Sequence, residues 1–129
     1  MIIIGAKGHA KEIYDVCLNN NIQVDFFFDN VSKENPIKLF DKKIITSLDD
    51  IKNEIVKDSR FIIGIGSPMN RKKVFDMFEK INGTPTSIIS KTAIISKFSH
   101  FELGINVMNF VYIGSNVFLG QGSLINTRA

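Results

Sequence analysis

The sequence has few of the residues that mark secreted, disulfide-rich or membrane-bound proteins. It contains no tryptophan, three prolines and one cysteine, Cys17, which has no second cysteine to form an internal disulfide. A single cysteine is typical of a reducing compartment, so we expect a cytoplasmic protein. No apolar run approaches the ~18 residues of a membrane span, and the opening Met-Ile-Ile-Ile is too short for a signal peptide. Cys17 lies beside Ile13 and Val16 on a predicted helix face, where we expect it to pack in the core.

Arginine and histidine are scarce as well. Of 16 basic residues only Arg60, Arg71 and Arg128 are arginine, and the net charge of +3 is a small excess. Aromatic and basic residues do not alternate anywhere, so we expect no nucleic-acid partner. The two histidines, His9 and His100, stand far apart, and no Cys, His and Asp cluster has metal-ligand spacing, so we expect no metal. The remaining composition, 44% hydrophobic and 22% charged, is that of an ordinary globular protein.

The first part of the chain alternates between apolar runs and helical patterns. Short buried strands are predicted at residues 1–4, 24–28, 43–46 and 61–66. A loop is predicted at residues 31–43. Ser47 is the expected N-cap of one helix, because Asp50 follows it three residues later, and Pro68 opens another helix. This alternation predicts an α/β structure with a parallel sheet and helical crossovers, equivalent to half of a Rossmann-like fold.

The last part of the chain follows a different pattern and holds only four charged residues after residue 89. Every sixth residue is large and apolar: Ile89, Ile95, Phe101, Val107, Ile113, Leu119 and Ile125. The residue four places after each is small or β-branched: Ala93, Ser99, Ile105, Val111, Val117, Ser123 and Ala129. A six-residue period predicts a triangular parallel coil of about 18 residues per turn, with the first set pointing inward. His100 stands at the last place of a hexad, where we expect an exposed turn.

Three motifs carry a resemblance to a known family. They are the loop Gly5–Lys11 (GAKGHAK), Ile65-Gly66 with Arg71 beyond it, and Leu124–Thr127 (LINT) within the hexads. With these motifs the chain resembles, over its whole length, the sugar O-/N-acetyltransferases that include bacterial sialic-acid and UDP-4-amino-sugar acetyltransferases. The resemblance implies a Rossmann-like N-terminal domain followed by a left-handed parallel β-helix of hexapeptide repeats.

The resemblance also implies an organisation and an activity. It divides the chain into a nucleotide-sugar-binding domain at residues 1–85 and the first β-helical coils at residues 86–129. It implies acetyl-CoA as co-substrate, a nucleotide-sugar acceptor that is UDP-linked, a role in surface-glycan biosynthesis, and a homotrimer. Its catalytic histidine belongs to the hexad after the Ile-Asn-Thr element, beyond Ala129. We therefore expect the N-terminal part of an enzyme, with no catalytic residue within this chain and no acetyl transfer by it.

By resemblance, Lys7, Gly8 and His9 contact the nucleotide sugar. Backbone N–H groups at a helix that follows a strand attract phosphate oxygens, which supports the same assignment. The alternative interpretation makes the loop a structural turn and His9 a helix-capping residue. His9 is not expected to be the catalytic base, because the family places that base on the β-helix.

Asp29, Asn30 and Gly66 complete the predicted substrate-binding set. Asp29 and Asn30 follow one predicted strand and Gly66 ends another, and open α/β sheets bind ligands at the carboxyl ends of their strands. Family members tend to carry two acids where this chain has Asp29 and Asn30, so selectivity for the base or ribose is expected to differ. A turn-forming Asp-Asn pair is the alternative. Arg71 is expected either to face a phosphate or to lie on a solvated helix face.

Two other functions compete with the acetyltransferase. One is a nucleotide- or dinucleotide-binding module without catalysis. The dinucleotide fingerprint has glycine at its first, third and sixth places, which here are Gly5, Lys7 and Ala10, so NAD is disfavoured. The other is a purely structural role, in which the hexads form an oligomerisation element.

Overall fold

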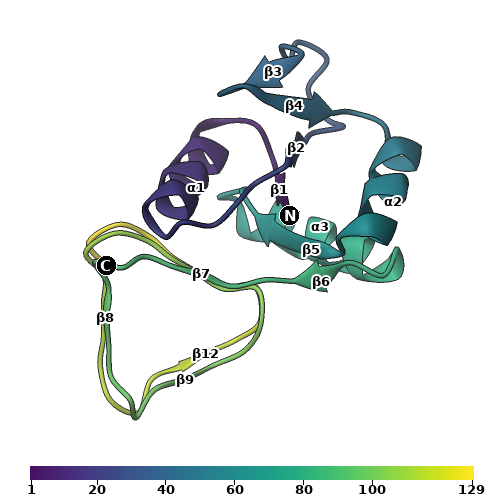
Figure 1. The fold of residues 1–129 in the computed structure, drawn as a ribbon. Helices are drawn as coiled ribbons and strands as arrows, with labels where there is room; N and C mark the ends of the chain where they lie inside the picture. Colours follow the sequence, from purple (N-terminus) through teal and green to yellow (C-terminus); the bar gives the residue numbers. More distant parts are fainter.

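The computed structural model describes residues 1–129 and consists of a layered α/β part followed by a three-sided coil (Figure 1). None of its helices has the length and apolar character needed to span a membrane. The α/β part contains β1 (Ile2–Ile4), α1 (Gly8–Asn19), β2 (Phe26–Phe28), β3 (Lys38–Leu39), β4 (Lys42–Ile45), α2 (Leu48–Lys57), β5 (Arg60–Ile63), α3 (Pro68–Lys80) and β6 (Thr84–Pro85).

These six strands form one sheet in the order β3-β4-β2-β1-β5-β6. All neighbours are parallel except β3 and β4, so the predicted parallel sheet is confirmed. In β1, Ile3 packs on one face while Ile2 and Ile4 pack on the other, because successive side chains of a strand alternate. All three are at most 2% exposed. Coverage of both faces explains why β1 is a continuous apolar run.

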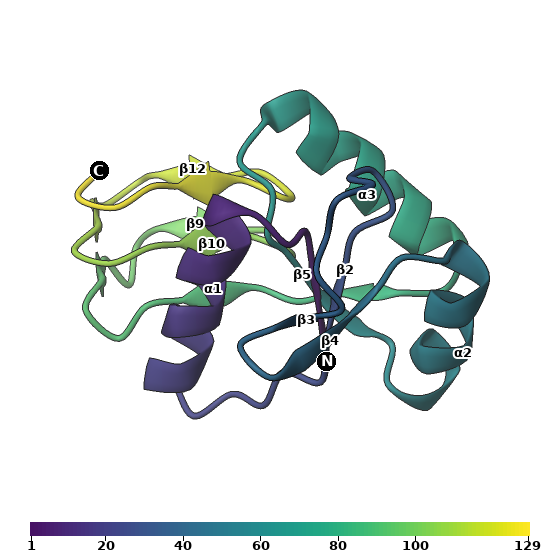
Figure 2. The same cartoon turned by 90° about the horizontal axis from the view of Figure 1, so that it is seen from above.

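The two faces of the sheet have different covers (Figure 2). On one face, Ile13 and Cys17 of α1 pack with Ile3, and Ile88 and Met108 of the coil belong to the same buried cluster. The predicted core position of Cys17 is confirmed. On the other face α2 and α3 supply the cover, through Ile51, Ile55, Phe75 and Phe78. The coil therefore shares with α1 the work of shielding one side of the sheet from water.

The coil is built from two-residue strands: β7 (Ile88–Ile89), β8 (Ile94–Ile95), β9 (His100–Phe101), β10 (Asn106–Val107), β11 (Tyr112–Ile113), β12 (Phe118–Leu119) and β13 (Leu124–Ile125). Parallel pairing joins β7, β10 and β13 on one side, β8 and β11 on the second, and β9 and β12 on the third. Asn106 pairs with both Ile88 and Leu124, so one turn takes 18 residues, as the hexad period predicts. Figure 1 views this part nearly end-on, as a triangle.

The interior of the coil is filled by the predicted apolar column, with one exception. Six of its seven residues pack in the interior cluster: Ile89, Ile95, Val107, Ile113, Leu119 and Ile125. Phe101 pairs in register with Leu119 and shares its inward orientation, but it is 43% exposed and does not join the interior cluster. Its strand β9 lies in the first turn and pairs only with β12, so this turn has a neighbouring coil on one side alone.

Three local predictions have different outcomes. The cap of α2 is confirmed, because Ser47 Oγ accepts a hydrogen bond from the Asp50 amide at 3.4 Å. The predicted loop at residues 31–43 is wrong in part, since it contains β3 and the start of β4. Phe40 and Asp41 form the hairpin turn with φ of 49° and 65°, a conformation in which Asn-Gly is the usual signal. His100 is exposed as expected, but it lies in β9 and not in a turn.

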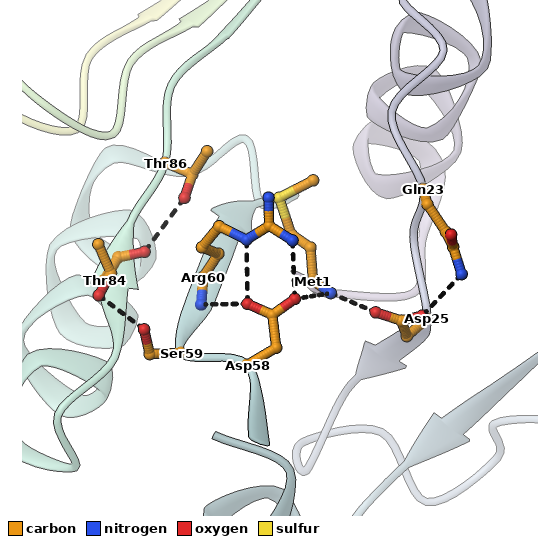
Figure 3. Close-up of polar contacts among 8 residues, drawn as sticks. All are labelled: Met1, Gln23, Asp25, Asp58, Ser59, Arg60, Thr84 and Thr86. Carbon is orange, nitrogen blue, oxygen red and sulfur yellow. Dashed lines mark hydrogen bonds and ion pairs between the residues drawn. The ribbon is translucent and has the colours of Figure 1, made fainter. Parts of the chain in front are cut away.

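A polar cluster occupies the amino ends of β1 and β5 (Figure 3). The terminal ammonium of Met1 contacts the carboxylates of Asp25 and Asp58, the latter at 2.8 Å. Arg60 donates to Asp58 from Nε at 3.0 Å and from Nη2 at 2.9 Å. Hydrogen bonds from Arg60, and then from the Met1 ammonium, hold the pKa of Asp58 well below its usual value. This cluster links the amino ends of the strands, on the side of the sheet opposite to their carboxyl ends.

Candidate functional site

The loops that follow β1, β2 and β5 meet at the carboxyl edge of the sheet. The Gly5 amide donates to the Phe28 carbonyl at 2.7 Å, and the Gly64 amide donates to the Ile4 carbonyl at 2.7 Å. Gly5 has a φ of +109°, and a Cβ atom there would lie 2.6 Å from the Gly64 carbonyl oxygen. Glycine is therefore required at this position for conformation and for space.

A cleft of about 480 Å³ opens at this edge. Its walls collect five of the six predicted substrate-binding residues: Lys7, His9, Asp29, Asn30 and Gly66. The sixth, Gly8, is the exposed first residue of α1 and does not line the cleft. Three sequence segments, the first two with 19 residues between them and the third further along the chain, thus converge on one cavity, as parallel strands ending at a common edge require.

The amino end of α1 forms one side of the cleft. Lys7 is its N-cap but makes no side-chain cap hydrogen bond, and the first turn contains no acidic residue. The first backbone N–H groups of the helix therefore keep their capacity to bind an anion, which the helix dipole favours. The His9 ring is 11% exposed; its Nδ1 lies 3.4 Å from Glu12 Oε2, and its buried Nε2 has no partner in the protein. His9 does not cap the helix, so that alternative is wrong.

Asp29 organises the loop that forms the opposite side. Its Oδ1 accepts hydrogen bonds from the Val31 amide at 2.9 Å and the Ser32 amide at 3.3 Å, and its Oδ2 accepts one from Asn35 Nδ2 at 2.9 Å. Burial acts to raise the pKa of Asp29, but these hydrogen bonds and the nearby Lys7 outweigh it and lower the pKa. Asp29 therefore lines the cleft as a carboxylate and also forms the turn that the alternative interpretation expected.

Helix α3 supplies a third wall that the sequence interpretation missed. Asn70, Lys73, Val74 and Met77 all line the cleft. Their spacing places them on one face of a helix, and this period was the signal that could have identified them. Lys73 adds a second cation to the cleft beside Lys7, which makes its walls suited to a ligand with negative charge.

Both predictions for Arg71 are wrong. Its side chain neither faces the cleft nor lies on a solvated helix face, because the residue is only 5% exposed. The guanidinium donates to the carbonyl oxygens of Gly122 and Ile65 and to Asn106 Oδ1. The flanking Lys72 is solvated, as its 76% exposed side chain indicates.

A larger cavity, about 580 Å³, lies between α3 and the coil. It shares Gly66 with the cleft, but its other walls come from the opposite face of α3 and from Gln121–Leu124. No other predicted substrate-binding residue lines it. The cleft at the strand ends, although smaller, is therefore the better candidate site.

The fold and the cleft define a class: an α/β domain with a mainly parallel six-stranded sheet and a cleft at its strand ends, followed by a three-sided coil of parallel strands. The family model described as the PglD N-terminal domain matches residues 1–78, and the chain belongs to this family. No curated protein matches the sequence.

Solved structures of acetyltransferases have the same fold. PerB from Caulobacter crescentus, in complex with CoA and GDP-perosamine, matches at a TM-score of 0.88 and 21% identity, over 98% of this chain and 59% of that one. A mutant of perosamine N-acetyltransferase from the same organism matches at a TM-score of 0.90 and 21% identity, over 98% of this chain and 60% of that one. The acetyltransferase domain of PglB from Neisseria gonorrhoeae, with acetyl coenzyme A, matches at a TM-score of 0.84 and 17% identity, over 98% of this chain and 61% of that one. The chain thus spans about three-fifths of the length of these relatives.

Proposed function

We propose that this chain is the N-terminal part of an acetyl-CoA-dependent acetyltransferase that acts on a nucleotide-linked amino sugar or sialic acid in surface-glycan biosynthesis. The observation that carries the proposal is the convergence of Lys7, His9, Asp29, Asn30 and Gly66 on one cleft. Membership in the PglD N-terminal domain family and the likeness to solved acetyltransferase structures support it.

The proposed domain division follows the change of sheet. Residues 1–85 form the nucleotide-sugar-binding domain, and residues 86–129 form the first coils of a left-handed parallel β-helix. Support comes from β6, which ends at Pro85 and belongs to the large sheet, and from β7, which starts the coil at Ile88. The handedness is the one that the family resemblance implies.

In the proposed complex the diphosphate lies against the amino end of α1. Lys7 and the free backbone N–H groups near Gly8 bind its charge, since charge-assisted hydrogen bonds are the stronger kind. His9 Nε2 donates to a phosphate or sugar oxygen. The loop organised by Asp29 faces the base and ribose, and Gly66 leaves open space beside them, because a Cβ atom there would meet nothing within 4 Å.

The proposed reaction is direct acetyl transfer. Acetyl-CoA, when bound, supplies the acetyl group as a thioester. The acceptor amine or hydroxyl loses its proton to a base while its N or O atom bonds to the acetyl carbon. The carbon–sulfur bond then breaks, and the departing thiolate takes that proton from the base and leaves as coenzyme A thiol. This chain binds and orients the acceptor; we assign no catalytic residue within residues 1–129, and no metal.

The proposed partners are the nucleotide sugar and two further copies of the protein, in the cytoplasm. Large apolar side chains on the outer faces of the coil support the homotrimer, among them Ile94, Phe98, Tyr112 and Phe118, which are 59–68% exposed. An interface between copies removes such surfaces from water. The family resemblance favours a UDP-linked acceptor, whereas PerB was solved with GDP-perosamine. Both nucleotides therefore belong in the test.

Calorimetric titration tests the proposal with three ligands: a UDP-linked amino sugar, a GDP-linked amino sugar and NAD. We expect one of the nucleotide sugars to bind more tightly than NAD. Lys7→Met should weaken that binding about tenfold or more, the usual effect of losing a charge-assisted hydrogen bond. Lys11→Met is the matched control, because Lys11 is an exposed residue of α1 outside the cleft. Tighter binding of NAD than of either sugar would favour the dinucleotide-binding module instead.

A further inference from the structure

Arg71 joins two parts of the molecule through a fork of hydrogen bonds. Its Nε and Nη2 both donate to the Gly122 carbonyl oxygen of the coil, at 2.9 and 2.7 Å. Its Nη1 donates to the Ile65 carbonyl oxygen, just after β5, at 2.8 Å, and to Asn106 Oδ1 of the coil at 2.8 Å. One side chain of α3 therefore binds the loop after β5 and two turns of the coil together.

This arrangement does not serve stability well. All partners of the guanidinium are uncharged oxygens, and the residue is 5% exposed. Burial lowers the pKa of Arg71 to about 10, so the group stays cationic at neutral pH. Asn106 turns its oxygen to Arg71, which leaves its buried Nδ2 without a partner in the protein. Replacing a buried ion pair by well-packed apolar residues is often neutral or stabilising, and this buried cation has no carboxylate partner. Its hydrogen bonds are therefore compatible with a positioning role as well as a packing role.

The segment that Arg71 holds is part of the cleft. Residues 64–67, here named the cleft loop, follow β5, and Ile65 and Gly66 line the cavity. Gly5 approaches this loop closely at Gly64: a Cβ atom added to Gly5 would lie only 2.6 Å from the Gly64 carbonyl oxygen. This close contact holds the loop at its first residue. Arg71 fixes it again one residue later, through Ile65. No other side chain donates a hydrogen bond to a carbonyl of the cleft loop.

We propose that Arg71 is a positioning residue that fastens the cleft loop to the coil and so sets the orientation of the cleft relative to the coil. The inference rests on the proposed function in one respect: there, the cleft holds the nucleotide and the coil leads to the site of transfer. A ligand in the cleft is then presented to the coil at a fixed angle. The five donors of arginine in one plane suit this task, whereas lysine carries three donors on a single atom.

Amide hydrogen exchange, followed by NMR without any ligand, tests the fastening directly. The reporters are the Gly122 amide, bonded to Leu103, and the Gly64 amide, which begins the cleft loop. In Arg71→Met both should exchange about tenfold faster or more, since each loses its neighbouring anchor. The Asp25 and Ser96 amides, at the far edge of the sheet and on another side of the coil, should keep wild-type protection.

Two further variants complete the test. Arg71→Lys keeps the positive charge, so the Gly122 and Gly64 amides should exchange at rates between those of the wild type and Arg71→Met. If Arg71→Met loses protection at all amides, the Arg71→Lys data alone test the inference. Lys72→Met is the matched control, because this neighbouring side chain is exposed and bonds only to Asp76. Wild-type exchange of the two reporters in both Arg71 variants would overturn the inference.

Titration with UDP and GDP measures nucleotide affinity, which would not change if Arg71 had only a structural role. In Arg71→Lys, the nucleotide that binds the wild-type chain should bind about tenfold more weakly, while the unfolding midpoint stays near that of the wild type. Unchanged affinity together with unchanged exchange would contradict the positioning role. If neither nucleotide binds the wild-type chain, the proposed function fails, and the exchange data alone decide the role of Arg71.

Discussion

Substituting Gly64 by alanine tests how tightly the cleft is built. A Cβ atom at Gly64 would lie 2.7 Å from Ile3 Cγ2, 2.9 Å from the Ile4 carbonyl oxygen and 3.0 Å from Ala10 Cα. The first obstacle is a side-chain methyl group that can shift. The other two are backbone atoms of β1 and α1, which move only if the strand or the helix moves.

The expected cost follows from these contacts. Overpacking a tight site costs about 1–3 kcal/mol, and two backbone obstacles place Gly64→Ala in the upper half of that range. Replacing glycine by alanine also restricts the unfolded chain, which stabilises the fold by about 0.4–1 kcal/mol. The net expectation is a loss of about 1–2.5 kcal/mol in the free energy of unfolding.

Urea unfolding followed by far-ultraviolet circular dichroism measures this loss, since the chain has no tryptophan for fluorescence. Gly66→Ala, two residues away, is the matched control. A Cβ atom at Gly66 would meet nothing within 4 Å, so its unfolding free energy should stay within about 0.5 kcal/mol of wild type. If Gly64→Ala unfolds at the same urea concentration as Gly66→Ala, the close approach of α1 to the strand ends is not as described.

Three other predictions concern the core and the edges of the molecule. Ile113→Ala, at a side chain 4% exposed inside the coil, should cost about 2–5 kcal/mol in urea unfolding; a cost below ~1 kcal/mol would remove Ile113 from the core. The pKa of Asp58 is lowered in the folded state, so its stabilising effect is present above its unfolded pKa and is lost as pH falls below about 5. Asp58→Asn should therefore be less stable than wild type at pH 7, with a difference that narrows on acidification; a constant difference would contradict the linkage. Burial raises the pKa of Cys17 to about 12, so iodoacetamide at pH 8 should label it only on unfolding, and fast labelling of the folded chain would refute this.

The sequence predicts those parts of the fold that depend on periodicity. The hexad period alone identifies the interior of the coil, including Val107 and Ile113, because a repeated side must present the same residue type inward at each turn. The apolar runs likewise predict the parallel sheet. Much of the cleft also follows, since residues after parallel strands, such as Asp29 and Gly66, converge on one edge of the sheet.

The parts that the sequence does not predict depend on contacts between distant segments. Arg71 stands next to two lysines and looks like part of a solvated face, yet most of its partners are backbone carbonyl groups, such as those of Ile65 and Gly122, which carry no side-chain signal. The hairpin turn at Phe40 and Asp41 lacks the glycine or asparagine that usually marks it. Phe101 fits its column but lies in the first turn of the coil, and a periodic pattern does not say where a stack begins.

The shared cluster of α1 and the coil has a consequence for taking this protein apart. Ile88 and Met108 rest in the same buried cluster as Ile3 and Ile62 of the sheet, so the coil occupies the position that a second helix takes in a three-layer sandwich. A segment ending at residue 85 would leave that half of the sheet bare and prone to aggregate. The two segments are therefore not interchangeable modules, because a coil transplanted from another protein must bring side chains that fit this sheet.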